Sequence, residues 1–458
     1  MHPYTLALLN ACLKSNYDVQ LFDPNYNNLS EKEVLDYFKN THADIVGVSS
    51  ISTEYIRASQ VMNAIIKKAL PNSTIINGGI IPTVMPELAI KDPNVDHWIM
   101  GEGDFRFSQL LNELSKPNPD LYSIDGLAFW NENKIIINQS KGFIENLDSI
   151  PFADYGNLSL IDYGNKVLKY SAGLLPRKFP CAVTISSRGC PYLCTFCAAS
   201  TVSGRKIRFR SAKNVLDEID MLYKTGIREI IFLDDHFLGN RKRAIQIMQG
   251  MIENKLDLTW KCVNLTIFLL DREILELMKE SGCYQMTLSI ESGNQYVLNN
   301  IIKKPVKLEK MPEILEMAKS IGFEIITNFV IGFPGETWEQ IRQTFRFAES
   351  IDVDLVNFHI ATPLPKTELM DICLRDGYLP KDFDIEKNLT SGYSKGMICS
   401  NEFTSNELEI LRAYEWDRIN FSTPERKKTI ARMEGISIEE LEKWRVETRR
   451  KAGVNVVK

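Results

Sequence analysis

Three cysteines lie within eight residues of one another, in the segment Arg188-Gly-Cys-Pro-Tyr-Leu-Cys-Thr-Phe-Cys197. Iron–sulfur clusters are held by cysteine thiolates, and a cubane cluster normally takes four of them. Cys190, Cys194 and Cys197 can therefore hold three irons on one short loop and leave the fourth iron open. An open iron can bind a small chelating ligand and pass it one electron. The spacing thus predicts redox chemistry on a ligand attached directly to a cluster.

A structural zinc site is the main alternative for these cysteines. Such a site takes four ligands, usually as two separated pairs of Cys or His. The next cysteines, Cys262 and Cys283, are isolated in apolar segments, and the nearest downstream histidine is His236. A second pair is therefore missing from the sequence. Chance clustering among nine cysteines is a weaker explanation still.

The CxxxCxxC pattern, with Phe196 before its last cysteine, resembles the signature of the radical S-adenosylmethionine (SAM) enzymes. The resemblance implies that the three cysteines are the catalytic ligands of a [4Fe-4S] cluster and that Phe196 lies against SAM. It also implies that the open iron chelates SAM and cleaves it to methionine and a 5′-deoxyadenosyl radical. An external one-electron donor of the flavodoxin or ferredoxin type is then an expected partner.

Residues 1–117 alternate helix-like and strand-like patterns. Apolar strands are expected at 18–23, 44–49, 74–79 and 95–100, and helices at 4–15, 30–40 and 53–68. Short apolar strands that alternate with helices predict a doubly wound, flavodoxin-like parallel sheet. Such sheets bind ligands beyond the carboxyl ends of their strands. Those ends carry Ser49-Ser50, Gly78-Gly79 and Gly101-Glu-Gly-Asp104.

This set of strand ends resembles the Rossmann-like cobalamin-binding domain that precedes many radical SAM domains. The resemblance implies cobalamin contacts from a set of small and polar residues: Ser49, Ser50, Thr53, Gly78, Gly79, Thr83, Gly101 and Glu102. The alternative is an ordinary flavodoxin-like domain with glycines in its turns. Two departures stand out. No side chain matches the family's cobalt-ligating histidine, for which His2 is a weak candidate. The first strand of the family's sheet is also missing. Either the true start of the chain lies upstream, or the domain has lost cobalamin.

The rest of the chain divides into three parts. A connector with a hairpin is expected over 118–180, and a partial (β/α)6 radical SAM barrel over 181–374. The barrel strands are expected at 181–187, 229–234, 258–264, 284–291, 323–331 and 354–360. Right-handed crossovers place the carboxyl ends of all six strands on one rim, where chemistry in such barrels occurs. The remaining part, 375–458, is expected to be mainly α-helical, with helices at 405–414 and 438–451.

The rim residues that follow these strands are the candidate SAM contacts. By resemblance to the family they are Asp234, Asp235, Glu291, Ser292, Gly293, Asn328 and Gly332. A carboxylate at Glu291 can accept hydrogen bonds from both ribose hydroxyls. For the Asp234–Asp235 pair, a helix cap or a salt bridge is the alternative role. The segment Pro363–Leu369 resembles a Pro-x-Pro-Gly-Thr-x-Leu element of the family, with Lys366 in place of glycine.

The composition is that of an ordinary globular enzyme, with 44% apolar and 25% charged residues in 458. A net charge of −5 without a long basic run gives no sign of nucleic-acid binding. The sequence contains no apolar run of 18 residues, so no membrane span is expected. The odd number of cysteines and an oxygen-sensitive cluster favour a reducing compartment, and a cytoplasmic location is expected.

The resemblance implies cobalamin-dependent methylation of an unactivated carbon, or of phosphinate phosphorus, in a biosynthetic pathway. Three alternatives remain open. The first is a cyclase, oxidoreductase or ring-rearranging enzyme similar to the anaerobic magnesium-protoporphyrin ester cyclases. The second is a radical SAM enzyme whose N-terminal domain no longer binds cobalamin, and the third is an electron carrier. The carrier is disfavoured because it needs neither Glu291 nor Gly332. A small-molecule or peptide substrate is expected.

Overall fold

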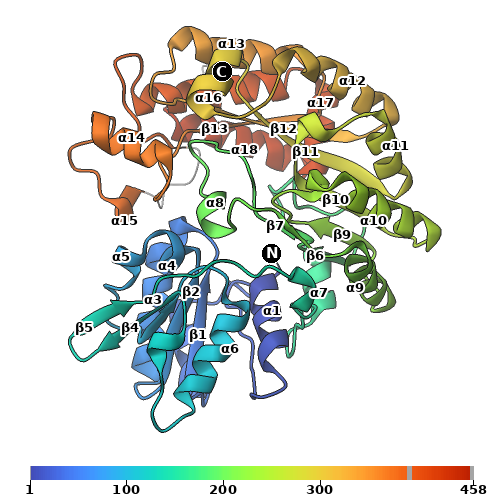
Figure 1. Ribbon diagram of the computed structural model, residues 1–458. Coiled ribbons are helices and arrows are strands. Elements are labelled where there is room, and N and C mark those ends of the chain that lie inside the picture. Colours follow the sequence, from blue (N-terminus) through green and yellow to red (C-terminus); the bar gives the residue numbers. More distant parts are fainter. Residues whose placement is uncertain (1, 389–394, 454–458) are drawn as a thin grey trace. The chain divides into compact units, whose positions relative to one another are not determined.

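The computed structural model describes residues 2–388 and 395–453, which form two compact units (Figure 1). Unit 1 comprises the chain up to Leu160, the segment Ala198–Arg208 and a short piece that begins at Asp384. Unit 2 comprises Ile161–Cys197, Phe209–Phe383 and the C-terminal helices. The border at Leu160 lies inside the segment 118–180 that we expected to be a connector.

Unit 1 is built on a five-stranded sheet in the order β1-β2-β3-β4-β5. Its strands β1 (Ile45–Ser50), β2 (Thr74–Gly79) and β3 (His97–Ile99) are parallel. The hairpin β4 (Leu127–Asn131) and β5 (Lys134–Ile137) adds two antiparallel strands beside β3. These strands and the hairpin lie where the sequence predicts them.

Leu13 and Leu110, from two helices of unit 1, pack with Ile76 and Leu127 of the sheet in one hydrophobic core. The main helices are α1 (Tyr4–Leu13), α2 (Glu31–Lys39), α3 (Ile56–Ala69) and α6 (Gly103–Leu114). Shorter helices are α4 (Ile80–Val84), α5 (Pro86–Ala89) and α8 (Ala199–Val202), with a 3-10 turn at Thr53–Tyr55. The predicted start of α2 is confirmed, because Ser30 and Glu33 form a reciprocal capping box.

The strand predicted at 18–23 is wrong. These residues are extended but belong to no sheet. The Leu21 N–H donates to Asn157 Oδ1 at 2.7 Å, and the Leu21 carbonyl accepts from Asn157 Nδ2 at 2.9 Å. A side-chain amide thus occupies the two backbone groups that a neighbouring strand would use.

Unit 2 is an open barrel of six parallel strands in the order β13-β12-β11-β10-β9-β6. The strands are β6 (Cys181–Thr184), β9 (Glu229–Phe232), β10 (Thr259–Leu265), β11 (Cys283–Glu291), β12 (Glu324–Ile331) and β13 (Leu355–Ile360). The helices between them are α9 (Ala212–Lys224), α10 (Arg241–Glu253), α11 (Arg272–Glu280), α12 (Met311–Ile321) and α13 (Trp338–Ser350). The six predicted strand–helix repeats are therefore confirmed. Short elements are α7 (Leu160–Asn165), β7 (Ser187–Arg188) and β8 (Arg208–Phe209).

Helices α14 (Glu368–Asp376), α15 (Ile385–Asn388), α16 (Ser405–Asn420), α17 (Pro424–Met433) and α18 (Ile438–Lys451) follow the barrel strands. Helix α16 packs along the edge strand β13, where the Asn420 side chain bonds both the N–H and the carbonyl of Val356 at 2.8 Å. This amide covers a free sheet edge that would otherwise expose unpaired backbone groups. Helix α18 has the predicted bounds, α16 is longer than predicted, and α17 was not predicted.

A buried polar network lies at the amino ends of the barrel strands. The Glu229 carboxylate has no exposed surface and accepts from the Tyr284 hydroxyl at 2.6 Å and from two backbone N–H groups. The Lys261 ammonium donates to the Leu175 carbonyl at 2.5 Å, and burial lowers its pKa to about 8. Because these groups lie at the end of the barrel opposite the carboxyl ends of its strands, where a site is predicted, we interpret the network as structural.

Candidate functional site

The cysteine loop follows β6 and β7 and is held by backbone contacts to two other segments. The Thr195 N–H and hydroxyl donate to the carbonyls of Ile302 and Ile301 at 3.0 and 2.9 Å. The Thr195 carbonyl accepts from the Leu369 N–H at 2.9 Å, close to the start of α14. The loop is thus anchored midway between the last two cysteines of its motif.

The three motif cysteines form no disulfide, and Cys197 is exposed. Burial raises the pKa of Cys190, and it raises the pKa of Cys194 to about 12, while the Lys304 charge lowers both. Within residues 2–388 and 395–453, no three Cys, His, Asp or Glu side chains converge closely enough to hold one metal ion. A cubane does not require such convergence, because each thiolate binds its own iron. The donor set therefore fits a cluster, whose binding displaces the thiol protons.

Two predicted SAM-site segments lie close to the cysteine loop. Glu291, the last residue of β11, is close enough to Cys194 to influence its pKa. Phe333 lies in the loop after β12, and the centroid of its ring is 5.7 Å from the centroid of the Phe196 ring. The structure thus brings together the cysteine loop and the carboxyl ends of β11 and β12.

Glu291 is held in an unusual conformation by a lysine that the sequence did not single out. Its φ is +76°, a left-handed value that costs a non-glycine residue on the order of 1–3 kcal/mol. The Lys304 ammonium donates to Glu291 Oε1 and to the Ser289 carbonyl, both at 2.7 Å. Backbone strain of this kind clusters at ligand sites. Lys304 follows a π-helix at Val297–Ile302, and no pattern in the sequence marks it.

The loop after β12 is organised by Glu336, which is completely buried. Its Oε2 atom accepts from the N–H groups of Gly332 and Phe333 at 2.7 and 3.1 Å, whereas Oε1 has no hydrogen-bond partner. Burial raises the pKa of Glu336 to about 7. Gly332 has a φ of +86°, and a Cβ there would lie 2.5 Å from Leu408 Cδ1, so only glycine fits.

We expect Glu336→Gln to change how stability depends on pH. The carboxyl of Glu336 ionises near pH 4.5 in the unfolded chain but only near pH 7 in the folded protein, so the stability of the folded state falls as pH rises between these values, whereas glutamine stays neutral. Each pKa unit corresponds to about 1.4 kcal/mol, so the free energy of unfolding of the variant should gain on the order of 3 kcal/mol over wild type between pH 5 and pH 8. Anaerobic urea denaturation at both pH values measures this. Glu339→Gln, at an exposed residue of α13, is the control, and equal pH slopes for wild type and Glu336→Gln would contradict the prediction.

Asp234 and Asp235 hold the segment that leads into the cysteine loop. The Asp234 carboxylate is buried and accepts from the Ser186 N–H at 3.0 Å and from the hydroxyls of Ser186 and Ser187 at 2.6 and 2.5 Å. Asp235 Oδ2 accepts from the Gly189 N–H at 2.9 Å. Both carboxylates thus bond the chain just before Cys190, and their contact with SAM remains a prediction.

Ser292 and Gly293 pack against α13. The Gly293 N–H donates to Thr344 Oγ1 at 3.0 Å, and a Cβ at this glycine would lie 2.5 Å from Phe347 Cβ. Asn328, by contrast, belongs to a row of polar side chains across neighbouring strands. Its Oδ1 atom accepts from Asn357 at 3.1 Å, and its Nδ2 lies 3.5 Å from Ser289 Oγ. Ser289 and Asn357 were not predicted, although each is a polar residue in a largely apolar strand.

In unit 1, two hydroxyls link the carboxyl ends of the parallel strands. Ser50 Oγ donates to the Gly78 carbonyl at 3.1 Å and accepts from the Ile81 N–H at 3.2 Å. Thr83 Oγ1 donates to the Gly79 carbonyl at 2.7 Å and accepts from the Gly101 N–H at 2.8 Å. These predicted cobalamin residues therefore fix the shape of the crevice at this edge of the sheet.

The two glycines at the end of β2 have different surroundings. Gly79 has a φ of +91°, and a Cβ there would lie 2.2 Å from the Ser50 carbonyl oxygen. The backbone conformation and the close approach of Ser50 therefore both require glycine at this position. A Cβ on Gly78 would meet nothing nearer than the Ile99 carbonyl oxygen, at 3.9 Å. Gly78 thus leaves room over the sheet. Ser49 pairs with Gly78 across the sheet, and Thr53 is buried in the 3-10 turn.

Glu102 lies in a buried ion pair. Its two carboxylate oxygens accept from Arg208 Nη1 at 2.9 and 2.8 Å, and Oε2 also accepts from the Ile144 N–H at 2.7 Å. The side chains of Glu102 and Arg208 are only 7% and 2% exposed. Its role as a cobalamin contact remains a prediction, but its carboxylate already has strong partners.

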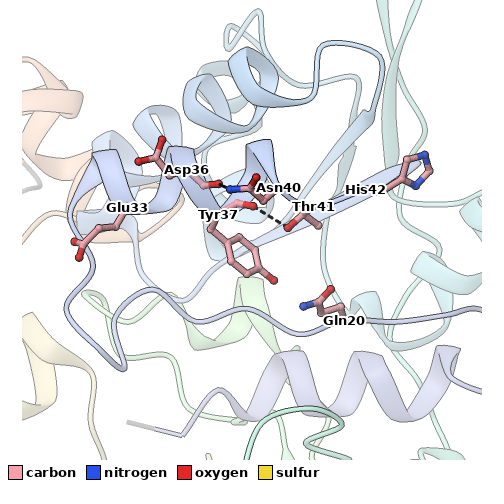
Figure 2. Close-up of a pocket in the computed structure, with 7 residues that line it drawn as sticks. All are labelled: Gln20, Glu33, Asp36, Tyr37, Asn40, Thr41 and His42. Carbon is pink, nitrogen blue, oxygen red and sulfur yellow. Dashed lines mark hydrogen bonds between the residues drawn. The ribbon is translucent and has the colours of Figure 1, made fainter.

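Figure 2 shows a surface hollow on unit 1, lined by Gln20, Glu33, Asp36, Tyr37, Asn40, Thr41 and His42. Its two hydrogen bonds, from Asn40 Nδ2 to the Asp36 carbonyl and from Thr41 Oγ1 to the Tyr37 carbonyl, are local contacts at the end of α2. Thr41 and His42 precede β1, so the hollow lies at the amino ends of the strands. Doubly wound sheets bind ligands at the other end, and we assign the hollow no function.

Two family models match the chain. Residues 184–348 match the radical SAM superfamily, and residues 1–111 match the B12 binding domain. In the part of the chain that the structure describes, no helix combines the length and apolarity needed to cross a membrane.

Named relatives agree with both matches. An uncharacterized methyltransferase of Pyrococcus horikoshii is 32% identical, over 82% of this chain and 79% of its own length. The cytidylyl-2-hydroxyethylphosphonate methyltransferase of Streptomyces wedmorensis is 28% identical, over 86% and 79%. The radical SAM methyltransferase TsrM of Kitasatospora setae, solved with cobalamin and a [4Fe-4S] cluster, has the same fold. Its TM-score is 0.69, the match covers 89% of this chain and 81% of that one, and the sequence identity is 17%.

Proposed function

This chain belongs to the radical SAM enzymes that carry a B12-binding domain, and we propose that it methylates an unactivated carbon, or a phosphinate phosphorus, of a small molecule. Its cofactors are those of the family: a [4Fe-4S] cluster, SAM and cobalamin. The observation that carries the proposal is the convergence of the cysteine loop with Glu291 and the loop after β12. The methyltransferase names of its relatives support methyl transfer as the outcome.

In this proposal, Cys190, Cys194 and Cys197 hold the cluster, which supplies the electron that cleaves SAM. Glu291 accepts hydrogen bonds from the ribose hydroxyls, and Lys304 orients its carboxylate through a charge-assisted hydrogen bond. Phe196 and Phe333 form an apolar wall that excludes water from a reactive radical. Glu336 acts indirectly, because it fixes the loop that carries Phe333.

Cobalamin supplies the transferable methyl group, and the crevice of unit 1 is where we propose that it binds. The missing Cβ at Gly78, whose place is not tightly packed, supports this placement, since a bulky ligand can approach the backbone closely only where no Cβ intervenes. Ser50 and Thr83 would act by holding the strand ends in place. The protein's contribution is thus positioning, while the cofactors carry the chemistry.

The decisive experiment uses protein reconstituted anaerobically with iron, sulfide and hydroxocobalamin, then given SAM and a strong reductant. Retained cobalamin is read from its absorbance, and 5′-deoxyadenosine and S-adenosylhomocysteine are quantified together. We expect bound cobalamin and both products. Deoxyadenosine with bound cobalamin but without S-adenosylhomocysteine would indicate a cyclase or rearrangement instead. Deoxyadenosine without retained cobalamin would overturn the methyltransferase proposal.

We further expect Gly78→Leu to lose cobalamin without losing the fold. A Cβ at this position makes only an ordinary contact, 3.9 Å to the Ile99 carbonyl oxygen, so the thermal midpoint should stay near that of wild type while cobalamin retention falls at least tenfold. Gly79→Ala is the matched comparison: its Cβ would clash with the Ser50 carbonyl, so this variant should lower the midpoint. Full cobalamin retention by Gly78→Leu would place the ligand elsewhere.

A further inference from the structure

Arg412 on α16 is a charged side chain without a matching charge. Its Nε atom is buried and has no hydrogen-bond partner. Its Nη1 atom makes one long contact, 3.3 Å to the carbonyl of Phe358. Across residues 2–388 and 395–453, no carboxylate lies within ion-pair distance of this guanidinium. Three buried arginines differ in this respect, since Arg208 pairs with Glu102, Arg210 with Glu218 and Arg445 with Asp417.

Arg412 is half-buried, and burying part of a guanidinium without an anion beside it is costly. Removing a charge from water costs several kcal/mol, and only a close counter-charge with good hydrogen bonds offsets this. Burial lowers the pKa of Arg412 against the opposing influence of Glu409 on the same helix. The five donors of arginine form a rigid fork that matches a carboxylate or a phosphate. The local structure thus supplies the donors of an anion site but not the anion.

Arg412 also lies beside the wall of the barrel where a ligand is expected. Phe358 packs its ring against Phe329 and Phe345 on the helix-covered face of the sheet. The alternation of side chains along a strand therefore turns Asn357 and His359 to the inner face. Burial lowers the pKa of His359, Glu291 raises it and Arg412 lowers it further, so both charges lie near this histidine.

Helix α16 carries Arg412 along the site already described. Leu408, one turn earlier on the same face, is the side chain that a Cβ on Gly332 would strike. The helix thus passes the loop after β12 before it reaches the edge of β13. Arg412 lies one turn beyond Leu408 and bonds the backbone of β13.

We propose that Arg412, with His359 beside it, binds an oxyanion, a carboxylate or phosphate group, of a ligand inside the barrel. The oxyanion comes either from the substrate or from the carboxylate of SAM. This inference rests on the proposed function for the identity of that ligand. It assigns the substrate pocket an anion-binding side chain and, in the first case, restricts substrates to anionic molecules.

The test compares wild type with Arg412→Gln, using the anaerobically reconstituted full chain and isothermal titration calorimetry. Inorganic phosphate is the first probe and SAM the second. We expect phosphate to bind wild type and to bind Arg412→Gln at least tenfold more weakly. Arg418→Gln is the matched control, because Arg418 lies on the same helix but pairs with Glu349 and Glu415 at the surface. Absent phosphate binding in wild type, or equal affinity in Arg412→Gln, would overturn the proposal.

Two further readouts separate the alternatives. If SAM affinity falls with phosphate affinity, the bound group is the SAM carboxylate, and if SAM affinity is unchanged, it is a group of the substrate.

Thermal denaturation without added anion tests a purely structural role: loss of an uncompensated charge should leave the midpoint of Arg412→Gln unchanged or raised, and a clear drop would contradict the proposal. Phosphate binding does not depend on methyl transfer. Absent S-adenosylhomocysteine with intact phosphate binding would therefore reject only the proposed function.

Discussion

Replacing Cys190, Cys194 or Cys197 singly by alanine is expected to abolish 5′-deoxyadenosine formation. In the proposed cluster each of the three thiolates would hold one iron, so loss of one cysteine should leave the cluster incomplete. The anchoring of the loop through Thr195 does not involve any of the three thiols, and the fold should therefore survive. Iron and sulfide content after anaerobic reconstitution, together with deoxyadenosine from SAM and reductant, measures the effect.

Cys399→Ala is the matched control for these variants. Cys399 is exposed and lies outside the motif, so its loss should leave both iron content and SAM cleavage at the level of wild type. Circular dichroism of the three motif variants should be unchanged. Deoxyadenosine formation that persists in any of them would reject that cysteine as a cluster ligand.

Arg208→Met is expected to destabilise the protein by about 3–5 kcal/mol, because it leaves the Glu102 carboxylate buried without its counter-charge. That loss is a large part of the stability of an ordinary domain. The double variant Glu102→Leu/Arg208→Met should recover most of it, since both charges are then replaced by apolar groups of similar size. Anaerobic urea denaturation of wild type, Arg208→Met, Glu102→Leu and the double variant measures the coupling between the two sites.

The same variants test the role of Glu102 in cobalamin binding. If its carboxylate is only a structural partner of Arg208, the double variant should fold and retain cobalamin as wild type does. A double variant that is stable but retains none would show that Glu102 contacts the cofactor. Equal stability of the single and double variants would instead contradict the ion-pair argument.

The barrel was predictable because strands buried on both faces consist of continuous apolar runs. All six strands of unit 2 lie within a few residues of their expected positions, as do β1, β2 and β3 of unit 1. The cysteine motif was equally clear, because its chemistry depends on local spacing. Glu291 was marked as the polar residue at the end of an apolar strand, and the structure places it beside Cys194.

The sequence was less informative where a distant partner decides the role of a residue. The sequence does not show which acidic residues the basic run Arg205–Arg210 contacts, yet Arg208 and Arg210 are buried against Glu102 and Glu218. Residues 18–23 have a strand-like pattern but bond the side chain of Asn157 instead. No local pattern contains either partner, and the same holds for Lys304 and Arg412.

Lys366 illustrates a departure that the sequence identified and the structure explains. It stands where the family has glycine, and its φ is +59°, in the left-handed region. The turn therefore keeps the conformation that glycine would adopt, although the lysine pays about 1–2 kcal/mol for it. Thr367, the next residue, still caps α14 through its hydroxyl.

The route of the chain between its two units limits how this architecture can be recombined. Cys197 belongs to unit 2, the next residues, Ala198–Arg208, to unit 1, and Phe209 again to unit 2. A gene fragment that encodes only the radical SAM region would carry Arg208 without Glu102. A chimera that exchanges the N-terminal domain between relatives should therefore also exchange this inserted segment, and residues 102 and 208 should vary together in evolution.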